Sequence, residues 1–182
     1  MSEIMTRSHI MFDPLQPDPA LIDITDIAHA LSMLCRANGH FKSFYSVGQH
    51  CINCAKEAQA RGYSRRVQLG CLLHDASEAY LSDVTRPVKK ELPQYKLIEE
   101  PLQRAIWDKW LTPGLTPEEE RLVFLVDDDI LEREFIALME HQLSDTLNPI
   151  FSAPQYAFTG FETCKNEFLQ LFAQLNAYTG DQ

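Results

Sequence analysis

The adjacent residues His74 and Asp75 follow an apolar run, where an imidazole and a carboxylate do not pack well. Burying two such groups without partners costs roughly several kcal/mol each, whereas one divalent cation would satisfy both. Two neighbouring residues supply too few donors to hold an ion, so other ligands must come from distant parts of the chain. His50 and the acidic run at 127–129 are the best candidates.

Within the acidic run, Asp127 is the preferred ligand because its helical neighbours three and four positions away are all apolar. Asp129 has charged neighbours at the same spacing, so we expect it to face outward. Asp128 is intermediate and stays open as the alternative ligand. The expected metal ligands are therefore His50, His74, Asp75 and Asp127.

This donor set indicates which ion would bind. Two imidazoles and two carboxylates suit Mn, Co, Zn, Fe, Ni or Mg, among which the sequence does not choose, and suit Ca less well. Such an ion lowers the pKa of a bound water and polarises a phosphoryl group. No histidine lies between Asp75 and Asp127, which disfavours a second bridged metal. We expect one divalent ion.

The elements that must position these residues are predicted to be helices. A first helix is expected to begin at a Thr25–Asp26 cap and to end at Gly39. A second, over 46–60, directs His50 toward the core, and a third, starting near residue 64, brings His74 to its buried end. Further helices are expected at 77–81, 93–110 with a kink at Pro101, 116–138 and 161–178, with turns at 83–87. No stretch alternates as strands do, so the predicted fold class is all-α.

Length and composition indicate one domain over 1–182. It divides into an N-terminal arm at 1–19, a motif-bearing core at 20–140, and a C-terminal helix and loop at 145–182. The prolines of the arm favour an extended chain there. A content of 45% hydrophobic and 23% charged residues is typical of a globular protein. The metal site is expected at the centre of this helical bundle.

Charge and cysteine usage limit the partners and the compartment. A formal net charge of -10 argues against binding of a nucleic-acid polymer. No apolar stretch is long enough to span a membrane and no signal peptide is evident, so we expect a cytoplasmic protein without a membrane partner. Five cysteines are best explained as reduced, buried thiols. The pair Cys51 and Cys54 is interpreted as a core feature rather than a redox motif.

Taken together, the ligands resemble the signature of the HD-domain phosphohydrolases, His…His-Asp…Asp, read here at His50, His74-Asp75 and Asp127. The segment 74–89 is similar to that of bacterial 5'-deoxynucleotidases and related prophage-type HD hydrolases, as are 35–50 and 127–139. The resemblance covers roughly residues 12–140. It implies an HD-type helical bundle with metal-dependent phosphohydrolase activity.

The resemblance also implies roles for other residues. Glu78 would be the general base or acid that acts on the metal-bound water, unless it is a surface glutamate. Asp83 would donate a proton or anchor a ribose hydroxyl, unless it only stabilises a turn. Arg36 matches a phosphate-binding arginine, with a structural salt bridge as the competing role. His40 and Lys89 are weaker candidates for substrate binding.

The implied substrate is a small phosphorylated metabolite, with a (deoxy)nucleoside 5'-monophosphate favoured. The alternatives are another phosphate ester, such as an alarmone or a cyclic nucleotide, and a non-catalytic metal- or nucleotide-binding regulatory module. Aromatic residues in the later helices would cover either a homodimer interface, common in the resembled family, or the chain's own core. They are Trp107, Trp110, Phe161, Phe168 and Phe172.

Overall fold

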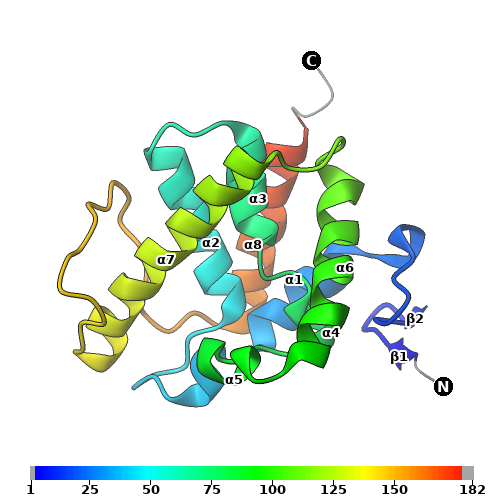
Figure 1. Cartoon of the computed structure of the whole chain (residues 1–182), viewed down its shortest axis with the longest axis horizontal. Helices are drawn as coiled ribbons and strands as arrows, with labels where there is room; N and C mark the ends of the chain where they lie inside the picture. The colour runs from blue at the N-terminus through cyan, green and yellow to red at the C-terminus, as the bar shows by residue number, and fades with distance from the viewer. Residues whose placement is uncertain (1–2, 178–182) are drawn as a thin grey trace.

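In the computed structural model, which describes residues 3–177, helices make up most of the chain and confirm the predicted all-α class (Figure 1). In chain order the elements are β1 (Ile4–Met5), β2 (Met11–Phe12), the 3-10 turn η1 (Pro19–Leu21), α1 (Ile24–Met33), the 3-10 turn η2 (Arg36–Gly39), α2 (Val47–Ala60), α3 (Arg65–Leu73), α4 (Glu78–Leu81), α5 (Arg86–Lys90), α6 (Pro93–Trp110), α7 (Pro117–Met139) and α8 (Phe161–Asn176). The predicted last helix reached 178, which lies outside the described residues.

Helices α2 and α3 form the centre of the molecule, with α7 packed on one side and α1 and α8 on the other (Figure 1). Gly70 of α3 allows the close approach of α7, because a Cβ atom there would lie 2.9 Å from Val123 Cγ2 and 3.0 Å from Leu115 Cδ1. Leu69 and Leu72 of α3 and Val126 of α7 are fully buried. This packing fixes the end of α3 against the middle of α7.

Side-chain caps start the central helices where the sequence predicted. Ser46 Oγ accepts a hydrogen bond from Gln49 N at 3.1 Å, and Ser64 Oγ accepts one from Val67 N at 3.3 Å. Thr116 begins α7 with a reciprocal capping box. These caps set the rotational phase of each helix and therefore which residues face inward.

The first helix is shorter than predicted. It is capped by Asp23, not by Thr25 and Asp26, and it ends at Met33. The chain then runs extended, because Cys35 forms an antiparallel bridge with Ser46, a partner that local sequence patterns do not reveal. Arg36 therefore lies in the turn η2 and not in a helix.

The N-terminal arm and the turn region also differ from expectation. The arm contains a short hairpin in which Ile4 pairs with Phe12, and Phe12 is fully buried against the Tyr80 ring. Asp26 Oδ1 accepts hydrogen bonds from Ser8 N at 2.9 Å and Ser8 Oγ at 2.7 Å, which ties the arm to α1. The helix α5 occupies part of the predicted turn at 83–87, with a proline in its first turn.

Most of the aromatic residues considered for a dimer interface lie inside the chain. Trp107, Phe168 and Phe172 are buried in the main core, and Trp110 packs edge-on against Phe172. Only Phe161 among them is exposed. The aromatic content of the later helices therefore does not indicate a dimer interface. Within residues 3–177, none of the helices has the length and hydropathy that a bilayer-crossing segment requires.

Candidate metal centre

Three separate segments bring four donor atoms to one point. His50 lies in α2, His74 and Asp75 directly follow α3, and Asp127 lies in the middle of α7. His50 Nε2 is 3.1 Å from both His74 Nε2 and Asp127 Oδ1. Asp75 Oδ2 is 3.3 Å from His74 Nε2 and 3.7 Å from His50 Nε2, and His74 Nε2 is 3.6 Å from Asp127 Oδ1.

The spacings among His50, His74 and Asp127, and those from Asp75 to the two histidines, are close to those of donors that share one ion. Ligand atoms bound at roughly 2.1 Å to the same cation lie about 3.0 to 3.4 Å apart. Asp127 Oδ1 is buried and has no well-oriented hydrogen-bond donor among the described residues. A carboxylate oxygen in that position is costly unless a cation neutralises it. The four residues could therefore hold a divalent ion.

The close packing of charged groups at this centre shifts the pKa values of His74 and Asp127. Burial raises the pKa of Asp127, but the neighbouring His50 and His74 outweigh it and hold that pKa well below its usual value. Burial lowers the pKa of His74, yet the charge of Asp75 and the contact with Asp127 raise it well above its usual value. His74 Nδ1 donates to Cys71 O at 2.7 Å, because a carbonyl oxygen can only accept. This bond orients the ring with Nε2 toward the other donors.

The three aspartates of the acidic run have different environments. Asp127 is only 7% exposed, whereas the Asp128 side chain is 59% exposed, so the geometry selects Asp127 as the fourth donor. The expectation that Asp129 faces outward is wrong. Asp129 is buried because Arg61, directly after α2, and Asn148, in the loop after α7, reach over it and donate to its carboxylate at 2.9 Å and 2.8 Å.

A sulfur atom that the sequence interpretation left out also borders the centre. Cys54 Sγ lies 3.5 Å from His50 Nε2, and the donor atoms of Cys54, His50, His74 and Asp127 all lie within 4.8 Å of one another. The donor atoms of Cys51, His74 and Asp75 form another such set. Burial raises the pKa of Cys54 well above its usual value. In the sequence, only its position one helical turn after His50 indicated that Cys54 would lie near the centre. The five cysteines are all free, and four of them are buried as expected, whereas Cys35 is half-buried.

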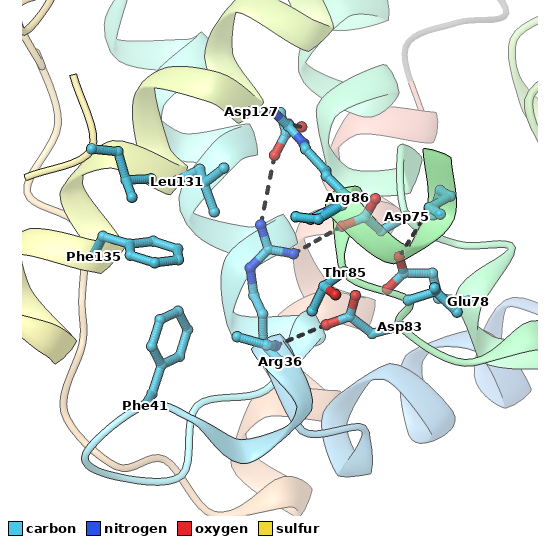
Figure 2. Close-up of a pocket in the computed structure, with 15 residues that line it drawn as sticks. Arg36, Phe41, Asp75, Glu78, Asp83, Thr85, Arg86, Asp127, Leu131 and Phe135 are labelled. Atoms are coloured by element: carbon cyan, nitrogen blue, oxygen red, sulfur yellow. Dashed lines mark hydrogen bonds and ion pairs between the residues drawn. The ribbon is translucent and has the colours of Figure 1, made fainter. Parts of the chain in front are cut away.

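A cavity of about 500 Å³ opens over these ligands (Figure 2). Asp75 and Asp127 line it, together with the cationic side chains of Arg36, Arg86 and Lys89. The opposite wall is apolar and includes Phe41, Leu131 and Phe135, of which the two phenylalanine rings meet edge to face with centroids 5.6 Å apart. A charged face and an apolar face therefore meet in one pocket.

Arg36 combines the two roles that the sequence left open. Its Nη1 lies 3.2 Å from Asp75 Oδ2 and its Nη2 3.7 Å from Asp127 Oδ1 (Figure 2). Its Nε donates to Glu134 Oε2 at 2.9 Å. The guanidinium thus makes buried salt bridges and also lines the cavity. Glu134 is a fully buried residue to which the sequence interpretation gave no role.

The turn that carries Arg36 is strained. Ala37 and Asn38 adopt left-handed conformations with φ of 53° and 51°, which costs a non-glycine residue roughly 1 kcal/mol. Asp83 Oδ2 accepts a hydrogen bond from Ala37 N at 2.9 Å and holds this turn from across the cavity. The turn leaves His40 exposed and away from the cavity lining, so the structure does not support His40 as a substrate ligand.

Glu78 lies on the cavity wall and is only 4% exposed, so it is not a surface glutamate. Burial and the negative charges of Asp75 and Asp83 raise its pKa well above the usual value. Lys89 also lines the cavity, with Nζ 3.9 Å from Glu78 Oε1 and 2.6 Å from Glu99 Oε1. Arg86, at the more exposed edge, donates to Asp127 Oδ2 at 2.6 Å.

Comparison with known proteins places the chain among bacterial relatives. No family model matches it. It is 39% identical over 119 residues to the uncharacterized protein YfdR of Escherichia coli K12, a match that spans 64% of this chain but only 61% of that relative. It is 34% identical over 134 residues to the uncharacterized protein RCAP_rcc00048 of Rhodobacter capsulatus, spanning 69% of this chain and 68% of the relative. The chain therefore belongs to the same protein family as RCAP_rcc00048.

Proposed function

We propose that this protein is an HD-type, metal-dependent phosphohydrolase that releases phosphate from a small nucleotide, with a (deoxy)nucleoside 5'-monophosphate favoured. The observation that carries the proposal is the convergence of His50, His74, Asp75 and Asp127 beside a cavity bordered by cationic side chains. The residue types and their order match the signature of the HD-domain phosphohydrolases.

Each group beside the cavity has a task in this reaction. A bound divalent ion would polarise a phosphoryl oxygen and lower the pKa of a water molecule. Mixed imidazole and carboxylate donors favour Mn, Co, Zn, Fe or Ni, and admit Mg. The Arg36 guanidinium lies on the cavity side of Asp75 and Asp127, where its planar fork would orient phosphate oxygens. Glu78 would accept and return the proton that moves during hydrolysis.

The shape of the cavity supports a nucleotide as the substrate. A volume of about 500 Å³ is in the ordinary range for small-molecule sites. The charged face suits a phosphate and a sugar, and the apolar face formed by Phe41, Leu131 and Phe135 suits a planar base. An alarmone carries more phosphate charge and would need more cations than the three that line the cavity, Arg36, Arg86 and Lys89.

Charge and cysteine chemistry support the remaining parts of the proposal. A net charge of -10 does not suit a nucleic-acid polymer. Five free thiols suit the reducing cytoplasm, so we propose cytoplasmic activity without a membrane partner. A homodimer stays a prediction, to be checked by the solution mass of the purified protein.

Phosphate release from a panel of nucleotides tests the proposal. The panel contains nucleoside 5'- and 3'-monophosphates and cyclic nucleotides, each assayed with Mn, Co, Zn and Mg. We expect release from the 5'-monophosphates, and a loss of about 100- to 10,000-fold in Glu78→Gln with its metal content unchanged. Glu100→Gln, at an exposed position, is the matched control and should keep full activity.

Two outcomes would contradict the proposal. Nucleotide binding without phosphate release under every metal would instead favour a regulatory binding module. Equal rates of phosphate release in wild type and Glu78→Gln would show that Glu78 does not transfer the proton.

A further inference from the structure

Glu134 of α7 accepts three hydrogen bonds although it is fully buried. Its Oε1 accepts from His50 Nδ1 at 2.6 Å and from the Tyr45 hydroxyl at 2.9 Å, and its Oε2 accepts from Arg36 Nε at 2.9 Å. A carboxylate in this environment has no proton to donate, so each of its three partners must be the donor. The Nδ1 atom of His50 therefore carries a proton, and Nε2 is the nitrogen that faces the other metal donors.

The hydrogen bonds continue from Glu134 to the other side of α2. The Tyr45 hydroxyl, having donated to Glu134, accepts from Asn53 Nδ2 at 2.8 Å. Asn53 Nδ2 also donates to Gln155 O at 3.0 Å, and Asn53 Oδ1 accepts from Gln155 N at 3.1 Å. If the Asn53 amide were flipped, its oxygen would face the Gln155 carbonyl oxygen and its NH2 group would face the Gln155 N–H. The two hydrogen bonds therefore fix the orientation of the amide. Tyr45 and Asn53 are buried, at 0% and 2% exposure.

Gln155 belongs to a segment that we call the C-terminal strap, residues 151–159, which has no helix or strand. Three α2 side chains spaced four residues apart bind its backbone. Gln49 donates to Ala157 O, Asn53 pairs with Gln155, and Glu57 accepts from the backbone of Phe151 and Ser152. Of these three, only Asn53 also bonds to the residues that reach His50.

We infer that Glu134 is a positioning residue that holds His50 in the tautomer with its proton on Nδ1, and that Tyr45 and Asn53 connect this tautomer to the C-terminal strap. His74 is oriented in the same sense by a backbone carbonyl, so His50 is the imidazole whose orientation depends on side chains. The inference rests on the metal centre of the proposed function but not on phosphate hydrolysis. A carboxylate on the far nitrogen fixes the ring and raises its basicity as a ligand.

The tautomer can be measured directly in wild-type protein by long-range 1H–15N NMR of the histidine rings. Spectra are recorded with Zn bound, because a cation between the two Nε2 atoms takes the place of the proton that would otherwise lie there. We expect the His50 resonances to be those of a ring protonated on Nδ1, and expect Glu134→Gln or Tyr45→Phe to weaken that pattern. A His50 ring protonated on Nε2 in the wild type would overturn the inference.

Metal affinity provides the second test and uses no substrate. Titration with Zn or Co should give about 10- to 100-fold weaker binding in Glu134→Gln, and about 3- to 10-fold weaker binding in Tyr45→Phe. Tyr156→Phe removes a hydroxyl from the ring that packs beside Tyr45, outside the hydrogen-bonded chain, and should stay within about 2-fold of wild type. If Glu134→Gln does not fold, Tyr45→Phe decides the outcome.

A matched pair of variants tests the connection between the metal centre and the strap. Asn53→Ala and Gln49→Ala each remove two hydrogen bonds between α2 and the strap, but only Asn53 also bonds to Tyr45. We expect weaker metal binding in Asn53→Ala than in Gln49→Ala. Equal affinities in this pair would refute the connection to the strap, and wild-type affinity in Tyr45→Phe would refute the positioning role. Because no nucleotide is present, a protein that hydrolyses nothing would still give these results.

Discussion

The Nε2 atoms of His50 and His74 lie 3.1 Å apart, although 24 residues separate the two histidines in the chain. Their rings are tilted by 59° with centroids 5.0 Å apart, so the imidazoles are not stacked face to face. If both Nε2 atoms were unprotonated, their lone pairs would repel each other at this distance. The contact is stable only when a proton or a cation lies between them. This contact is the strongest geometric sign that the two side chains are arranged for a shared ion.

The acidic run offers a matched pair that tests the ligand assignment. Asp127→Asn replaces a carboxylate donor at the centre, whereas Asp128→Asn changes the adjacent, exposed carboxylate. We expect Asp127→Asn to lose about tenfold or more in metal affinity, because an amide is a weaker ligand than a carboxylate, and Asp128→Asn to bind like the wild type. Metal content after dialysis measures both. Equal metal retention in the two variants would remove Asp127 from the ligand set.

Glu57 should stabilise the fold well away from the metal centre. Its buried carboxylate accepts from Phe151 N, Ser152 N and Ser152 Oγ, and pairs with Arg61 Nε at 2.8 Å. Glu57→Gln should lower the free energy of unfolding by about 2 kcal/mol, because a buried charged acceptor is lost. Thermal unfolding should show a drop of about 4 to 8 °C. Glu140→Gln is the control, since the Glu140 side chain is 80% exposed.

The contribution of Glu57 to the unfolding free energy should depend on pH. Burial raises the pKa of Glu57, but the hydrogen bonds from Ser152 and Arg61 outweigh it and lower the pKa below its usual value. A carboxyl whose folded pKa is lowered contributes stability above its unfolded pKa of about 4.3, and loses it as the pH falls through the folded value. The difference in unfolding free energy between wild type and Glu57→Gln should therefore shrink below about pH 4. Urea unfolding over a pH series measures it, and a difference that grows on acidification would contradict a lowered pKa at Glu57.

Gly70 allows the contact between α3 and α7, so a methyl group there should be destabilising. The added Cβ would meet Val123 and Leu115 at 3.0 Å or less. Gly70→Ala should cost about 1 to 3 kcal/mol of stability and should also weaken metal binding, since the proposed ligands His74 and Asp75 directly follow α3 and Asp127 lies in α7. Gly160→Ala is the control, because nothing lies within 4 Å of its Cβ position. Equal unfolding free energies for the two variants would refute the close-packing explanation.

Local patterns in the sequence predicted the parts of the structure that depend on local interactions. Ser46, Ser64 and Thr116 cap the helices that follow them, and these caps fix the helical phase that directs His50 inward. The apolar neighbours of Asp127 favoured it over Asp128, and the exposure of Asp128 in the structure then decided between them. The all-α class followed from the same periodicities.

Features that depend on distant partners could not be predicted in this way. The end of α1 depends on the bridge between Cys35 and Ser46, and the burial of Asp129 depends on Arg61, 68 positions earlier. Glu134 lay within a matched segment, but its three donors come from other parts of the fold. Membership of the HD phosphohydrolases stays a prediction, which the metal and phosphate assays test.

Because Asp127 lies in α7, a nascent polypeptide that has emerged only as far as α6 already contains three of the four oxygen and nitrogen donors but cannot complete the set. Docking of α7 supplies the last donor and, through Glu134, the carboxylate bonded to His50. Tight retention of an ion would therefore show that the chain has been synthesised through α7 and that α7 has docked.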